Sequence, residues 1–281
     1  MSTKPRVLAE GLRFPEGPRW RDGRLYFSDM HAGRVLALDA DGRCEEVLAL
    51  DGDEPSGLGW LPDGRLLVVA MRARKLLRRD PGGLAVHADL APLLPLLAND
   101  MVVDGRGRAY VGNFGFDLHA GERPRPTSLA LVHPDGRSEL AAADLLFPNG
   151  SVVTPDGRTL IVAESFGARL TAFDVAADGR LSRRRVFAAL EGAVPDGICL
   201  DAEGAVWVAS PVSHGALRVR EGGEVTHRIA VERQAYACML GGPERRTLFL
   251  CTAESPDPAA TAARRGRIEA VEVDVPGAGW P

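Results

Sequence analysis

The tetrapeptide Phe147-Pro148-Asn149-Gly150 decides the fold of this chain, because five variants of it recur along the sequence. The variants are Phe14-Pro15-Glu16-Gly17, Glu54-Pro55-Ser56-Gly57, Leu97-Ala98-Asn99-Asp100, Val194-Pro195-Asp196-Gly197 and Gln234-Ala235-Tyr236-Ala237. Neighbouring copies start roughly 40–50 residues apart, which is a period typical of propeller blades. The sequence therefore predicts six similar units.

Each unit has the pattern of four antiparallel strands. A turn such as Asp22-Gly23 or Asp63-Gly64 separates the tetrapeptide's strand from an apolar run, and Asp-Gly between such runs is a strong hairpin signal. A third run and a second turn, for example Asp41-Gly42, follow in most units. No long segment shows a sustained helical period. We therefore expect an all-β, six-bladed β-propeller.

The last unit lacks a strand, and the chain begins with one too many. The sixth unit runs out of strand-like sequence before Pro281, and Arg6-Val7-Leu8-Ala9 precedes the first unit without a partner. We expect this N-terminal strand to complete the last blade, closing the ring and covering an exposed sheet edge. Residues 1–281 are then predicted to form a single propeller domain.

Composition excludes several classes of partner. The net charge of −4 and the pI of about 5.9 argue against nucleic-acid binding. No apolar run is long enough to span a bilayer, and no N-terminal signal region is apparent. The four cysteines form no CxxC pattern that would indicate a zinc site. These features predict a cytoplasmic protein, a monomer or a small homo-oligomer, that acts on a small molecule.

Polar residues of the tetrapeptides should meet at one end of the channel. In a blade the first strand is innermost, so Glu16, Asn99, Asn149 and Asp196 share one face with the ends of the second strands. Carboxylate and carboxamide oxygens favour Ca²⁺, Mg²⁺ or Mn²⁺ over a structural zinc. Singly, Asn or Asp before Gly also suits a turn. Their equivalent positions in several units favour a metal or substrate site.

Four of these motifs, in this order and spacing, resemble the SMP-30/gluconolactonase/luciferin-regenerating-enzyme family: Phe14-Pro15-Glu16-Gly17-Pro18, Asn99-Asp100, Phe147-Pro148-Asn149-Gly150 and Pro195-Asp196-Gly197. The resemblance implies a six-bladed propeller with one divalent cation deep in the channel. It places the metal ligands on Glu16, Asn149 and Asp196, and sets Asn99 against a metal-bound water or the substrate. Calcium is the expected ion, with Mg²⁺, Mn²⁺ and Zn²⁺ as alternatives.

The resemblance also implies hydrolysis of a lactone, which is a cyclic ester. A cation would act as a Lewis acid on the carbonyl oxygen, and Asp196, the family's proposed acid/base, would activate the attacking water. Asp100 is a second candidate base, or a structural cap on its strand. Three alternatives remain open: another ester hydrolase, a ring-opening or ring-closing isomerase, and a non-enzymatic propeller that binds a metal or ligand.

One departure from the family pattern bears on the substrate. Sugar-lactone hydrolases of this family tend to carry a basic residue two positions before the asparagine of the third unit, where this chain has Leu97. Leu97 would make one wall of the binding cavity apolar, and an apolar wall favours apolar or aromatic lactones. The other candidate apolar members of this wall are Met30, Met71, Phe114, Phe116, Phe147 and Met239, and the alternative is that several of them pack between blades.

The expected polar substrate contacts are Asn99, Asp100, Asn113 and His119. His119 lies in the longest insertion, Phe116 to Thr127, and a long loop at an open face often acts as a lid. The other histidines show no ligand spacing.

Overall fold

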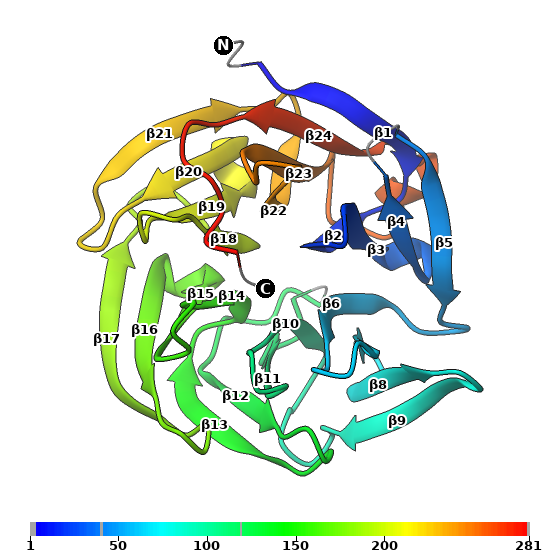
Figure 1. The fold of residues 1–281 in the computed structure, drawn as a ribbon, viewed down its shortest axis with the longest axis vertical. Coiled ribbons are helices and arrows are strands. Elements are labelled where there is room, and N and C mark those ends of the chain that lie inside the picture. The colour runs from blue at the N-terminus through cyan, green and yellow to red at the C-terminus, as the bar shows by residue number, and fades with distance from the viewer. Residues whose placement is uncertain (1–3, 40–41, 119, 280–281) are drawn as a thin grey trace.

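The computed structural model describes residues 4–39, 42–118 and 120–279. They form six four-stranded antiparallel sheets arranged radially around a central channel (Figure 1). The predicted all-β, six-bladed propeller is confirmed. The innermost strands of neighbouring blades contact one another around the ring, so each tetrapeptide lies beside the channel.

The strands follow the chain from the channel outward in five of the blades. Blade 1 contains β2 (Pro15–Arg21), β3 (Arg24–Asp29), β4 (Arg34–Leu38) and β5 (Cys44–Ala49). Blade 2 contains β6 (Pro55–Trp60), β7 (Leu66–Ala70), β8 (Lys75–Asp80) and β9 (Gly83–Asp89). Blade 3 contains β10 (Ala98–Val103), β11 (Ala109–Asn113), β12 (Thr127–Val132) and β13 (Ser138–Leu145). Blade 4 contains β14 (Pro148–Val153), β15 (Thr159–Glu164), β16 (Arg169–Val175) and β17 (Leu181–Ala189). Blade 5 contains β18 (Ile198–Leu200), β19 (Val206–Ser210), β20 (Gly215–Val219) and β21 (Val225–Ala230).

Blade 6 joins the two ends of the chain, as the strand count predicts. It contains β22 (Gln234–Gly241), β23 (Thr247–Ala253), β24 (Gly266–Glu272) and the N-terminal β1 (Arg6–Leu12). β1 runs antiparallel to β24, with Arg6 opposite Ala270 and Leu12 opposite Gly266. The blue and red strands lie side by side in Figure 1. This pairing gives β24 a partner on its outer edge, so the N-terminal strand closes the ring.

The glycine of the tetrapeptide keeps neighbouring blades close together. A Cβ atom on Gly57 would lie 2.3 Å from the backbone nitrogen of Met101 in the next blade, and one on Gly150 would lie 2.5 Å from the backbone oxygen of Asp196. Both distances are far below van der Waals contact. The motif therefore marks a close approach between inner strands, which needs glycine for its missing side chain.

Among the residues that the structure describes, helical structure is limited to short 3₁₀ turns. They span Met30–Ala32, Ser165–Gly167, Pro211–Ser213 and Ala260–Ala263, each following the second strand of its blade. Within the described residues, no helix has the length and apolar character needed to cross a membrane. The first three turns contribute residues to the cavity described next.

Candidate metal and substrate site

One cavity gathers the polar residues of the tetrapeptides. It has a volume of ≈ 200 Å³. The third residues of five tetrapeptides line it: Glu16, Asn99, Asn149, Asp196 and Tyr236. The sixth, Ser56, is buried just outside, with its hydroxyl 3.4 Å from Asn99 Oδ1. The structure thus brings residues from separate blades to one place, while their roles as ligands stay predictions.

The floor of the cavity is polar and largely shielded from solvent. Glu16, Asn99 and Asn149 are buried, and Asp196 is partly buried. Asn149 Nδ2 donates to Asp196 Oδ1 at 2.5 Å and to Ser165 Oγ at 3.2 Å. Glu16 Oε2 accepts a hydrogen bond from the backbone N–H of Gly17 at 2.8 Å. Each side chain is therefore held by the strand or turn beside it.

Burial and mutual repulsion make these carboxyl groups weak acids. Burial, reinforced by the charge of Asp100, raises the pKa of Glu16 to about 8. Burial and the charges of Glu16 and Asp100 raise the pKa of Asp196 well above its ordinary value. Burial also raises the pKa of the Tyr236 hydroxyl, with Asp196 adding to the effect. A bound cation would reverse this balance, since an adjacent positive charge favours the ionised carboxylates.

The donor set suits a hard cation. Among the described residues, no three His, Cys, Asp or Glu side chains are grouped so that they could hold a metal ion, so a site here depends on amide oxygens as well as Glu16 and Asp196. A half-turn of the Asn149 amide would bring its oxygen to the position of Nδ2. The buried Nδ2 of Asn99 has no hydrogen-bond partner within the described structure. Carboxylate and amide oxygens of this kind fit Ca²⁺, Mg²⁺ or Mn²⁺.

Apolar side chains form the wall above the floor. The expected residues Met30, Met71, Leu97, Phe114 and Phe147 all line the cavity. Two other expected members lie elsewhere, as described next.

Phe116 and Met239 do not line the cavity. Phe116 is buried against the rings of Phe147 and Phe166, with centroids 5.8 and 5.0 Å away. Met239 packs into the core where blades 5, 6 and 1 meet. Neither residue belongs to the wall of the cavity; both follow the alternative, in which the side chain packs inside the protein.

Phe147 is held in the wall by a strained backbone. Its φ is 60°, a left-handed conformation that is unfavourable for a bulky residue and more so before a proline. The ring packs 4.5 Å from Phe114 and 5.3 Å from Phe166, centroid to centroid. Strain of this kind clusters at functional sites, which agrees with a ring placed to meet a ligand.

The ends of the second strands alternate between the wall and the framework. The last residue of a strand is buried and supports the entry to its blade, as when Asp29 Oδ1 accepts the N–H of Phe14 and Glu164 Oε2 accepts that of Leu146. The residue after it lines the cavity, as Met30 and Ser165 do. The last residue of the strand and the first residue of the turn after it therefore point in different directions.

The predictions that Asn113 and Asp100 contact the substrate were wrong, because both side chains point away from the cavity. Asn113 is fully buried, donating to the Ser128 carbonyl at 2.6 Å and accepting from Thr127 Oγ1 at 2.7 Å. Asp100 follows Asn99 on β10 and pairs with Arg19 at 2.8 Å. In the described chain neither lines the cavity, so the structure does not support either as a substrate contact. The remaining predicted contact, His119, lies outside the described residues.

Among the cavity residues that sequence reasoning missed are two with ionisable side chains, His31 and Glu54, and one with an amide, Gln234. His31 lines the cavity with its ring stacked on Phe14 at 4.8 Å and its Nδ1 2.8 Å from Thr261 Oγ1. Glu54 and Gln234 line it from the first positions of their tetrapeptides. Their signal was present, because the first and third residues of a tetrapeptide share one side of an extended strand. His31 follows Met30 in a 3₁₀ turn, which strand periodicity does not predict.

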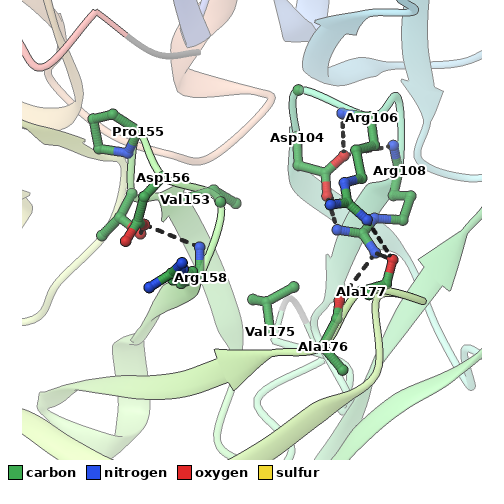
Figure 2. A pocket seen from close by; sticks show the side chains of 13 residues that line it. Asp104, Arg106, Arg108, Val153, Pro155, Asp156, Arg158, Val175, Ala176 and Ala177 are labelled. Carbon is green, nitrogen blue, oxygen red and sulfur yellow. Dashed lines mark hydrogen bonds and ion pairs between the residues drawn. The ribbon is translucent and has the colours of Figure 1, made fainter.

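A second cavity lies at the opposite end of the inner strands, between blades 3 and 4. It measures ≈ 480 Å³ and is lined by three turns, residues 104–108, 153–158 and 175–177. Figure 2 shows the Asp104–Arg108 pair, with Arg106 and Arg108 donating to the carbonyl of Ala177. No described tetrapeptide residue lines it. These hydrogen bonds join two blades, and we assign this cavity no ligand.

Comparison with known protein families identifies the family of this chain. A family model described as the SMP-30/Gluconolactonase/LRE-like region matches residues 14–254. The chain belongs to this family. The match spans all six tetrapeptides, so the resemblance seen in four of them is confirmed across the propeller.

Relatives within the SMP-30/gluconolactonase/LRE-like family include regucalcins and gluconolactonases. Regucalcin of Xenopus laevis is 26% identical over 259 residues, covering 88% of this chain and 85% of its own. Gluconolactonase of Zymomonas mobilis is 26% identical over 247 residues, covering 75% of this chain and 68% of its own. The crystal structure of a calcium-binding protein, regucalcin from Agrobacterium tumefaciens, has a TM-score of 0.81 at 24% identity, covering 99% and 96% of the two chains. That structural likeness establishes the shared fold.

Proposed function

We propose that this protein is a divalent-metal-dependent lactonase. The observation that carries the proposal is the convergence of Glu16, Asn99, Asn149 and Asp196 from four blades on the floor of one apolar-walled cavity. Two relatives support it within the family: a gluconolactonase, and a regucalcin described as calcium-binding. Calcium is the proposed ion, bound by Glu16, Asn149 and Asp196.

The proposed reaction opens a cyclic ester with water. A bound divalent cation would supply a Lewis acid for the carbonyl oxygen. Asn99 would orient the substrate or the attacking water from the floor. Asp196 would take the proton of that water, a contribution worth roughly 10²–10⁴-fold in rate. Asn149 Nδ2 lies 2.5 Å from Asp196 Oδ1, so both side chains would reach a single cation.

The proposed substrate carries an apolar or aromatic group. Leu97, Met71 and Phe114 line the cavity where hydroxyl groups of a sugar lactone would need partners. Each hydroxyl buried without a partner costs about 1–3 kcal/mol, and 1.4 kcal/mol is about tenfold in rate. We therefore expect dihydrocoumarin or an alkyl γ-lactone to be preferred over gluconolactone.

A lactone panel tests the proposal. The protein is stripped with chelator, reloaded with Ca²⁺, Mg²⁺, Mn²⁺ or Zn²⁺, and assayed on sugar, alkyl and aryl lactones. Turnover should require a cation and fall at least about a hundredfold in Asp196→Asn. Asp274→Asn, the same substitution at an exposed aspartate outside the cavity, serves as the control and should leave turnover unchanged.

Three outcomes would replace the proposal. Turnover of linear esters alone would indicate another ester hydrolase. Interconversion of two ring forms without uptake of water would indicate an isomerase. Cation binding with no turnover of any ester or lactone would indicate a non-enzymatic metal-binding propeller, a possibility kept open by the calcium-binding regucalcin.

A further inference from the structure

A buried arginine lies beneath the floor of the cavity. Arg19 follows Glu16 by three residues on β2 and is only 3% exposed. Its Nη1 donates to the Pro18 carbonyl at 2.8 Å. Its Nη2 donates to Asp100 Oδ1 at 2.8 Å and to the Met101 carbonyl. The guanidinium therefore connects blade 1 to blade 3, next to the carboxyl groups of the site.

The Arg19–Asp100 pair lies at a different location in the propeller from two other buried arginine–aspartate pairs. Arg108 with Asp104, and Arg218 with Asp201, are equally buried, with N–O distances of 2.6 Å. Each of those pairs forms within one blade, and Asp104 and Asp201 lie in the turns between the first and second strands, away from the floor. The Arg19–Asp100 pair crosses between blades, and both members act electrostatically on Glu16.

The charged side chains around the floor sum to a small negative net charge. Glu16, Asp100 and Asp196 carry three negative charges when ionised, and Arg19 carries one positive charge that it does not lose. Glu54 also lines the cavity, but Arg72 Nη2 pairs with its Oε1 at 3.0 Å. Burial raises the pKa of the nearby Cys251 thiol well above its ordinary value, so that thiol stays neutral. The ionised floor therefore carries a net charge of −2.

We propose that the Arg19–Asp100 pair sets the charge of the floor so that one divalent cation neutralises it. The inference rests on the cation site proposed above and adds two residues that do not touch the ion. A buried charge is poorly screened, so a change of one unit near the site alters cation affinity strongly. Asp100 would then strengthen cation binding through its negative charge. Arg19 would offset one unit of the negative charge of the floor and would donate a hydrogen bond to the buried carboxylate of Asp100.

Two variants of the intact protein test the inference through Ca²⁺ affinity, measured by titration calorimetry after chelation. Asp100→Asn leaves Arg19 charged and lowers the floor to −1, so Kd should rise at least about tenfold. The double variant Asp100→Asn with Arg19→Met returns the floor to −2. Its Kd should fall back to within about threefold of the original value. A role in packing alone predicts the opposite, because the double variant removes more hydrogen bonds than the single one.

The Asp104–Arg108 pair supplies the matched control, since Arg108 also bonds an aspartate and backbone carbonyls (Figure 2). Asp104→Asn, alone or with Arg108→Met, should lower the free energy of unfolding and leave Kd unchanged. A double variant at Asp100 and Arg19 that binds no better than Asp100→Asn overturns the inference and leaves the lactonase proposal standing. An unsubstituted protein that binds no divalent cation overturns both.

Discussion

Replacing Gly150 by alanine should disturb the fold and the site together. The added Cβ would lie 2.5 Å from the Asp196 carbonyl oxygen, 2.6 Å from Ile198 N and 2.7 Å from Gly197 Cα. All three are backbone atoms, which do not rotate away as a side chain does. A Cβ essentially never approaches another atom within 3.0 Å, so β14 and the segment before β18 must separate by about half an ångström.

The size of the effect follows from that separation. Overfilling a packed interior costs about 1–3 kcal/mol, which we expect as the loss in the free energy of unfolding. The same shift separates Asn149 from Asp196, whose side chains are 2.5 Å apart. Metal–ligand distances tolerate deviations of about 0.2 Å. We therefore expect Ca²⁺ to bind roughly tenfold to a hundredfold more weakly.

Urea unfolding and titration calorimetry measure the two effects. Gly82→Ala is the control, because a Cβ there meets no atom within 4 Å, and it should change the free energy of unfolding by less than about 0.5 kcal/mol. A Gly150→Ala protein with the original unfolding free energy and Ca²⁺ affinity would refute the reasoning that links blade spacing to the site.

Four further predictions concern ring closure, pH and substrate choice. Deleting residues 1–10 removes most of β1 and exposes the edge of β24, so the urea midpoint should fall; an unchanged midpoint would argue against closure by this strand. Ca²⁺ binding at pH 7 should release protons, because Glu16 has a pKa of about 8, and calorimetry in two buffers of different ionisation enthalpy should detect them. In the metal-free protein, the raised pKa of Glu16 stabilises the folded state. This contribution is complete below the ordinary pKa of 4.5 and is lost as pH rises through about 8. A melting temperature that rises across that pH range would contradict the assignment. Leu97→Arg should raise kcat/KM for gluconolactone relative to dihydrocoumarin, and an unchanged ratio would show that this position does not select the substrate.

The repeated tetrapeptide carried most of what could be predicted from sequence. Its period predicts the blade count, and the strand deficit before Pro281 predicts that β1 completes the last blade, as observed. Its third position predicts the cavity floor, because symmetry carries equivalent residues to one end of the channel. The repeat did not predict the direction of every polar side chain near the floor. Asn113 and Asp100 were expected at the cavity, and both instead bond to the surrounding strands.

The sequence by itself determined the architecture and the polar floor, since both depend on a local pattern repeated at a regular interval. Tertiary structure alone decided what surrounds that floor. Arg19 meets Asp100 across 81 residues of sequence, and His31 meets Thr261 across 230. Contacts of this kind leave no periodic trace, because each is made once, between side chains that only the closed ring brings together. The charge of the floor is therefore a property of the folded propeller, while the residues that line it are a property of the repeat.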